Sequence, residues 1–145
     1  MLKNLPPLLT PDALHALASM GHGDEVAIVD ANFPAMRLAA RGPRLVRLPG
    51  TTSADVLQAV LAVLPLDDFE TPASWTMQVV GDADAVPPAA ADLRQALADA
   101  GEGAPGSLER FAFYERAGTA FLILQSGELR KYGNILLRKG VLAED

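Results

Sequence analysis

The stretch "EVAIVD" (residues 25–30) decides the fold. It is a short run of apolar, mainly β-branched residues that ends on an acidic one. A run of this kind is typical of a strand buried on both faces, as in the parallel sheet of an α/β protein. Ligands of such sheets tend to lie beyond the carboxyl ends of the strands. The pattern therefore predicts a buried strand and places Asp30 where a ligand would bind.

Helices and strands are expected to alternate around this run. A helix capped by Thr10 begins at Pro11 and ends at Gly21. Further strands are expected over 44–48, 75–81, 119–127 and 133–141. Further helices are expected within 51–66 (capped by Thr52 or Ser53), over 92–100 after a Pro/Ala-rich linker, and over 107–118 with Ser107 as its cap. This alternation predicts a single layered α/β domain over residues 1–145, with a largely parallel central sheet flanked by helices.

Composition excludes several classes of function. Half of the 145 residues are hydrophobic and 21% are charged, as in a folded globular protein. The net charge of −6 disfavours binding to nucleic acid or to an anionic membrane surface. The chain has no cysteine, and its longest apolar run, "VLQAVLAVLPL" (56–66), is too short to cross a membrane. With no recognisable signal peptide, we expect a cytoplasmic protein.

Motifs for nucleotides and metals are weak or absent. "GEGAPG" (101–106) matches the G-x-G-x-x-G motif of a dinucleotide-binding loop, but it follows a predicted helix, whereas the motif requires a preceding strand. His15 and His22 are seven residues apart, on either side of the end of a predicted helix. A metal site of His22, Asp24 and Asp30 is conceivable. We expect neither a metal nor a cofactor.

His22 is the first candidate functional residue. It lies between Gly21 and Gly23, eight residues before Asp30, a separation compatible with both side chains lining one pocket. The glycines would let a ligand approach closely, and an imidazole can give and take a proton near neutral pH. A loop histidine with a purely structural role explains the same residues, and the sequence alone leaves both interpretations open.

A second candidate group lies near the end of the chain. Tyr132 and Asn134 flank Gly133, and they would point to the same face of an extended segment. A phenol beside an amide could bind sugar hydroxyls, although an edge tyrosine at the start of a strand is an equally simple interpretation. Arg110, on a predicted helix, could contact a ligand or remain solvated.

Three motifs stand out along the chain: "MGHGDEVAIVDANFPA" (20–35), "ERFAFYERA" (109–117) and "KYGNILLRKGV" (131–141). Together they resemble the L-fucose mutarotase and D-ribose pyranase family, and the "ERFAFYERA" block is similar to its fucose branch. The resemblance runs from Met1 to about Val141, with no recognised motif over 82–106. It implies an enzyme that interconverts the anomers of a free monosaccharide without a cofactor. His22 would be the proton donor, and Asp30, Arg110, Tyr132 and Asn134 would bind the sugar.

The resemblance also implies a homo-oligomer, commonly a decameric ring, in which the Tyr-Gly-Asn segment reaches a neighbouring subunit's pocket. Two alternatives stay open: a pyranase that interconverts pyranose and furanose forms, and a non-catalytic sugar-binding or transport-accessory protein. Relatives of the fucose type often have His after "DA", where this chain has Asn32. The sequence therefore leaves the choice of sugar open.

Overall fold

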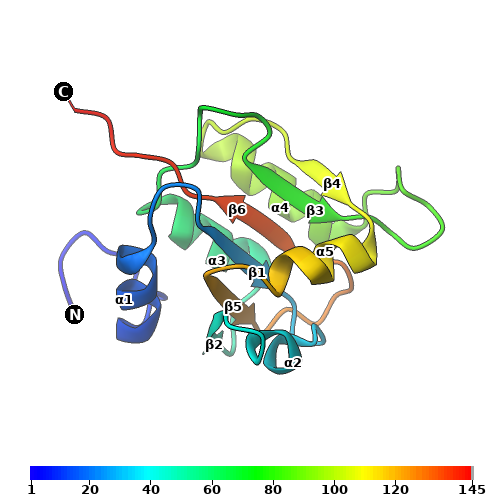
Figure 1. The fold of residues 1–145 in the computed structure, drawn as a ribbon, viewed down its shortest axis with the longest axis horizontal. Coiled ribbons are helices and arrows are strands. Elements are labelled where there is room, and N and C mark those ends of the chain that lie inside the picture. Colours follow the sequence, from blue (N-terminus) through cyan, green and yellow to red (C-terminus); the bar gives the residue numbers. More distant parts are fainter. Residues whose placement is uncertain (145) are drawn as a thin grey trace.

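The predicted buried strand is at the centre of the sheet. The computed structural model describes residues 1–144. In it β1 (Glu25–Val29) lies between a parallel neighbour, β5 (Leu122–Ser126), and an antiparallel one, β6 (Ile135–Arg138) (Figure 1). Four consecutive side chains of β1, from Val26 to Val29, have 0% solvent exposure. Burial of both faces explains why the run is continuously apolar instead of alternating.

Six strands form one mixed sheet within residues 1–144. The others are β2 (Arg44–Leu48), β3 (Ser74–Met77) and β4 (Gly106–Leu108), and the order is β2-β5-β1-β6-β3-β4. Within the described residues, β6 is the strand that runs against its neighbours, while the other pairs are parallel. The largely parallel sheet is thus confirmed. Since β6 runs in reverse, it begins at the edge where the other strands end.

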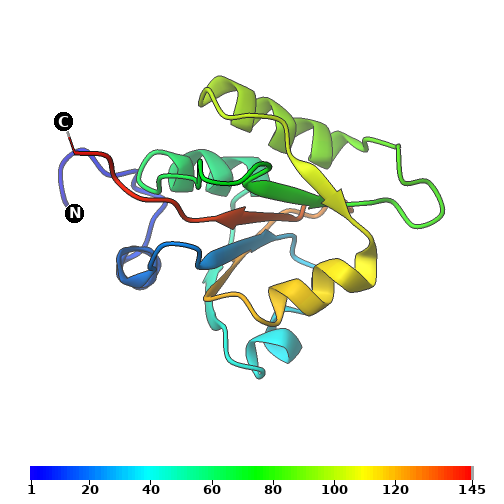
Figure 2. The same ribbon diagram turned by 45° about the horizontal axis from the view of Figure 1, so that its top comes forward.

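Helices cover both faces of the sheet. Core contacts place α1 (Pro11–Ser19), α3 (Ser53–Leu61) and α4 (Pro88–Asp99) on one face, and α2 (Ala35–Ala39) and α5 (Arg110–Ala117) on the other. Figure 2 shows α3 and α4 on one side and α2 and α5 on the opposite side. No helix among residues 1–144 is long and apolar enough to span a bilayer.

The predicted helix caps at Thr10 and Thr52 are confirmed. The Thr10 hydroxyl accepts a hydrogen bond from the N–H of Ala13 at 3.2 Å. Thr52 forms a reciprocal capping box with Asp55: its hydroxyl accepts from the Asp55 N–H, and the Asp55 carboxylate accepts from the Thr52 N–H. The capping box at Thr52 therefore satisfies two backbone N–H donors at the start of α3, and the Thr10 cap satisfies one at the start of α1.

The predicted cap at Ser107 is wrong. Ser107 lies within β4, which pairs with β3, and α5 begins only after Glu109. The Glu109 carboxylate accepts from the N–H groups of Phe111 and Ala112. The short helix α2 was not predicted, α4 starts at Pro88 instead of 92, and β3 ends at Met77 instead of 81. The five residues of α2 and the four of β3 are too few to show a period. α4 begins earlier because Pro88, part of a segment with the composition of a linker, occupies the first turn of the helix, where proline is tolerated.

We expect Thr52→Ala to lower the free energy of unfolding by about 1 kcal/mol, because α3 would lose its capping box. Urea unfolding followed by circular dichroism measures the change. Thr52→Ser keeps the hydroxyl acceptor and is the matched control, so its stability should stay close to that of the unsubstituted protein. Equal destabilisation by both variants would show that the cap is not the cause.

Candidate functional site

Most of the predicted site residues meet at one edge of the sheet. Asp30 directly follows β1, Met77 ends β3, and Asn134 precedes the reversed strand β6, so all three lie at the same edge. A pocket of about 170 Å³ opens there. Its lining is formed by Asp30, Asn32, Phe33, Met77, Arg110, Tyr114, Lys131, Tyr132 and Asn134. Four of the five predicted site residues are therefore brought together.

The pocket suits a small ligand that carries several hydroxyl groups. It is smaller than the roughly 300–1,000 Å³ of pockets that hold drug-sized molecules. Carboxylate, amide, phenol and cationic groups line it, beside the rings of Phe33 and Tyr114, which pack edge to face at 5.3 Å. Polar groups can bind hydroxyls while the rings contact C–H surfaces.

Asp30 and Asn134 are linked directly. The N–H of Asp30 donates to the Asn134 Oδ1 at 2.9 Å, and the Asp30 carboxylate accepts from the N–H of Asn32 at 3.1 Å. Asp30 is only 5% exposed. Burial raises the pKa of Asp30 above its usual value, although hydrogen bonds from Asn32, Asn134 and nearby backbone groups oppose the shift.

Tyr132 reaches the pocket by an unexpected backbone conformation. Its φ of 63° lies in the left-handed region, so the prediction of an extended segment is wrong at this residue. Its hydroxyl accepts a hydrogen bond from the N–H of Val80 at 3.1 Å. The phenolic proton remains able to donate to a ligand.

A buried group of polar side chains supports the turn from behind. The Ser53 hydroxyl donates to the carbonyl of Gly133 at 2.6 Å and contacts the hydroxyl of Ser126. A Cβ at Gly133 would lie 2.8 Å from both Ser53 Oγ and Glu128 Cγ, so only glycine fits between Tyr132 and Asn134. The Arg130 side chain, hydrogen-bonded to Glu128, lowers the pKa of that buried carboxyl. The spacing of the two ligand-facing side chains is therefore fixed by packing.

Arg110 stands at the rim of the pocket on the first turn of α5. Its guanidinium lies 5.0 Å from the ring centre of Phe111 and 5.6 Å from that of Tyr114. These rings orient the side chain without using its N–H donors. Arg110 can therefore hydrogen-bond a ligand oxygen.

His22 lies at the opposite edge of the sheet. β1 separates it from Asp30, and five strand residues span roughly 16 Å at about 3.3 Å each. The imidazole instead contacts Asp67 and Phe69, and its neighbour Gly23 has a φ of +85°. The prediction that His22 and Asp30 line one pocket is thus wrong within a single chain. The turn conformation accounts for Gly23 without a ligand.

The Tyr-Gly-Asn segment lines the pocket of its own chain, where the Asn134 side chain accepts a hydrogen bond from the N–H of Asp30. That the segment also reaches a neighbouring subunit's pocket stays a prediction. Of the five predicted site residues, His22 is the one that does not line the pocket of its own chain. Any shared site would combine the pocket of one copy with His22 of another.

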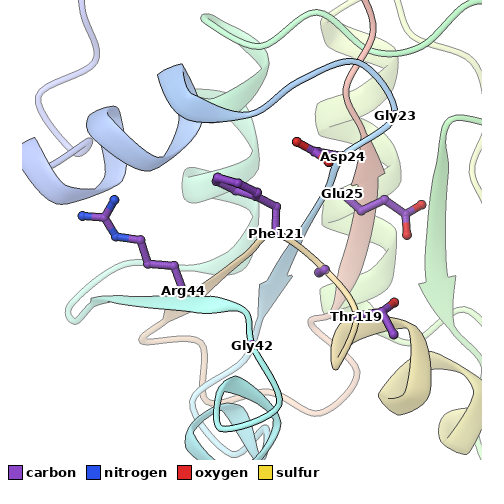
Figure 3. Close-up of a pocket in the computed structure, with 8 residues that line it drawn as sticks. Gly23, Asp24, Glu25, Gly42, Arg44, Thr119 and Phe121 are labelled. Atoms are coloured by element: carbon purple, nitrogen blue, oxygen red, sulfur yellow. The ribbon is translucent and has the colours of Figure 1, made fainter.

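A larger hollow of about 490 Å³ lies near His22, at the start of β1, β2 and β5. In Figure 3 the charged side chains around it point apart. Arg44 extends toward α1 and contacts His15, while Glu25 is paired with Arg116. The hollow therefore lacks a converging set of free polar groups.

No group of three or more metal-ligating side chains converges anywhere in residues 1–144. The conceivable site of His22, Asp24 and Asp30 does not form within a chain, because Asp30 lies at the far end of β1 from the other two.

Sequence reasoning missed several pocket residues. Phe33 lies in the quoted "DANFPA" segment and Lys131 adjoins Tyr132, so both could have been found by proximity to a motif. Met77 and Tyr114 had no such signal, because an apolar or aromatic residue in a strand or helix is most simply interpreted as core.

Comparisons with known proteins agree on one family. A family model described as "RbsD / FucU transport protein family" matches residues 3–142. The fucose mutarotase of Homo sapiens is 44% identical over 146 residues, covering 98% of this chain and 95% of that protein. The crystal structure of the fucose mutarotase from Streptococcus pneumoniae, in complex with L-fucose, is 35% identical with a TM-score of 0.88, covering 98% of this chain and all of that one. Bacillus subtilis RbsD, complexed with D-ribose, is 20% identical with a TM-score of 0.75 over 99% of this chain and all of its own, which shows a shared fold.

Asp30→Asn is expected to make the protein more stable at neutral pH. Because burial raises the pKa of Asp30, the folded chain binds its proton more tightly than the unfolded chain. The contribution of Asp30 to stability therefore falls as pH rises from the unfolded pKa of 3.8 through the higher folded one. Urea unfolding between about pH 4 and pH 8 tests this. The advantage of the variant should grow with pH and then level off, and an advantage that shrinks with pH would contradict the raised pKa.

Proposed function

Because the chain belongs to the RbsD / FucU transport protein family, we propose that it is a mutarotase, an isomerase that interconverts the α and β anomers of L-fucose or a related free sugar. The observation that carries this proposal is the pocket at the carboxyl edge of the sheet. It gathers Asp30, Arg110, Tyr132 and Asn134 in a volume suited to a monosaccharide. Similarity to fucose mutarotases over nearly the whole chain supports the same activity.

The reaction requires only proton transfer. The ring opens when a base removes the proton of the anomeric hydroxyl and an acid protonates the ring oxygen, and it recloses on the other face of the carbonyl. Each positioned acid or base contributes about 10²–10⁴-fold to the rate. The proposed reaction therefore calls for no metal or cofactor.

Each pocket residue makes a different contact with the sugar in the proposed complex. Asp30 accepts a hydrogen bond from a sugar hydroxyl, and Arg110 and Asn134 donate to sugar oxygens. Tyr132 donates its phenolic proton and is a candidate second proton carrier. Asn32, exposed at the rim, contacts the part of the sugar that distinguishes one monosaccharide from another.

The proton donor, His22, comes from a second copy of the chain. Its own chain keeps it at the opposite edge from Asp30, so two copies must meet head to tail to complete a site. The edge that carries His22 presents the exposed ring of Phe69 and the acidic Glu70, whereas the pocket rim presents Phe111 and the cationic Lys131. Apolar and opposite-charge surfaces of this kind suit contact. Head-to-tail contacts close into a ring when the rotation between successive copies allows it, as in the decamer implied by the family resemblance.

Two other functions make different predictions. A pyranase would open the same ring but reclose it through another hydroxyl, and a sugar-binding or transport-accessory protein would bind without accelerating exchange. The lower identity to the ribose-bound relative favours the mutarotase. The decameric size and the cytoplasmic location remain predictions.

NMR exchange spectroscopy with L-fucose, D-ribose, galactose and glucose tests the proposal. We expect added protein to strengthen cross-peaks between the pyranose anomers of fucose. Stronger pyranose–furanose cross-peaks would favour the pyranase instead. Sugar binding without any change in exchange would overturn both enzymatic functions.

His22→Ala should slow anomer exchange by about 10²–10⁴-fold, because the site would lose its proton donor. His15→Ala is the matched control, since it removes the other histidine of the chain and should keep most of the activity. Full activity of His22→Ala would contradict the role of His22.

A further inference from the structure

The loop between β3 and α4 makes one contact with a pocket residue that the proposed reaction does not explain. The loop projects beyond the sheet (Figure 1), and within it the N–H of Val80 donates to the Tyr132 hydroxyl at 3.1 Å. Val80 does not line the pocket itself. It lies on the wall of a neighbouring hollow of about 320 Å³, which shares Arg110 with the pocket. Val80 can therefore act on a sugar in the pocket through Tyr132.

The backbone around Val80 leaves its N–H free to make this bond. The N–H of Asp82 donates to the carbonyl of Val79 at 3.1 Å, and Gly81 has a φ of +79°. A four-residue turn closed in this way, with a positive φ at its third residue, is a type II turn. Val80 is the second residue, whose N–H takes no part in closing the turn. The turn therefore presents a fixed donor to Tyr132.

The turn is anchored to the sheet. Two residues before Val80, the N–H of Gln78 donates to the carbonyl of Leu108 at 2.8 Å, and the Gln78 side chain donates to the hydroxyl of Ser107 at 3.0 Å. Both acceptors belong to β4, which pairs with β3. The donor at Val80 is therefore held close to the strands, whatever the exposed end of the loop does.

Tyr132 is held at both of its ends. Its φ of 63° is a left-handed conformation, which a residue other than glycine keeps only when its surroundings fix it. On the backbone side, the hydroxyl of Ser53 donates to the carbonyl of the next residue, Gly133, at 2.6 Å. At the far end of the side chain, Val80 holds the phenolic oxygen. The backbone and the hydroxyl of Tyr132 are thus both fixed before a ligand arrives.

We propose that Val80 is a positioning residue for Tyr132, and that its backbone N–H directs the phenolic proton toward the sugar. The inference rests on the proposed function for its role in catalysis. An N–H donor occupies a lone pair of the phenolic oxygen and repels the hydroxyl proton, so the proton turns away from Val80. Because Tyr132 lines the pocket and Val80 lies outside it, that direction is the side of the ligand.

The same bond acts while the sugar ring opens. Negative charge develops on the ring oxygen until that oxygen is protonated, and a hydrogen bond from Tyr132 to it strengthens as the charge grows. The phenolic oxygen then becomes more negative, and the N–H of Val80 stabilises it. In the proposed function, the other pocket residues bind the sugar before the ring opens as well as after. The effect of Val80 should therefore fall on kcat more than on KM.

Val80→Pro removes the N–H and tests the proposal in the full chain. Proline is favoured at the second position of a type II turn, and Val79, which precedes it, forms an antiparallel bridge with Asp82, so the turn should keep its shape. We expect kcat for anomer exchange of L-fucose to fall by about 3- to 10-fold, the effect of one net hydrogen bond. KM should change little. Urea unfolding checks that the variant is folded.

Ala83→Pro is the matched control, because it places a proline at the same position of the next turn in the same loop. The N–H of Ala85 closes that turn by donating to the carbonyl of Asp82 at 3.2 Å. The N–H of Ala83 has no acceptor within the described residues 1–144. This variant should therefore keep both kcat and KM.

A second substitution shows whether the effect passes through the hydroxyl. Tyr132→Phe removes the acceptor of the Val80 N–H, so adding Val80→Pro to it should lower kcat no further. A further loss in the double variant, of the size that Val80→Pro causes alone, would show that the proline acts on the pocket by another route. That result would overturn the proposal.

Amide hydrogen exchange tests the bond without any measurement of activity. The Val80 amide should exchange slowly in the unsubstituted protein and faster in Tyr132→Phe. An exchange rate that Tyr132→Phe leaves unchanged, or an unchanged kcat in folded Val80→Pro, would overturn the role of Val80 while leaving the mutarotase proposal intact. If no sugar exchange is accelerated, the proposed function fails, and the Val80 amide still decides whether the turn holds Tyr132. Since this measurement needs no proline variant, it decides the point even if Val80→Pro does not fold.

Discussion

The length and burial of β1 constrain everything else in this molecule. The strand is fixed on both sides by β5 and β6, and its central side chains are fully buried, so it cannot bend to bring its two ends together. His22 precedes it and Asp30 follows it. The imidazole of His22 and the pocket are consequently held at opposite edges of one rigid sheet. A site that uses both must take them from two copies.

The reversed direction of β6 builds each half of that site. At its start it brings Asn134 against Asp30, and Gly133 packs closely on Ser53. At its end the chain contacts Asp67, the partner of His22. Both halves of the proposed shared site are thus assembled by hydrogen bonds within one chain, and under that proposal association of two copies needs only to bring preformed surfaces together. Such preorganisation reduces the cost of aligning an acid with its substrate.

Much of the fold could be predicted from residue patterns, because the apolar run of β1 and the cap at Thr52 are local signals. Strand pairing was harder to predict. Serine is a common helix cap, yet Ser107 belongs to β4, which pairs with β3. For the site, the motifs identified Asp30, Arg110, Tyr132 and Asn134, which the structure gathers in one pocket. A separation of eight residues could not show that a straight strand lies between His22 and Asp30. Sequence spacing likewise gave no indication that His22 contacts Asp67, which lies 45 residues away in the chain.

Complementation between two inactive variants tests the shared site most directly. His22→Ala and Asp30→Ala chains are co-expressed in equal amounts, and mixed oligomers are verified by native mass spectrometry. Each variant alone should lack activity. If His22 and Asp30 of one site come from different copies, random assembly leaves about one site in four unsubstituted, so the mixture should recover about a quarter of wild-type exchange. Mixed oligomers as inactive as either parent would contradict a site shared between chains.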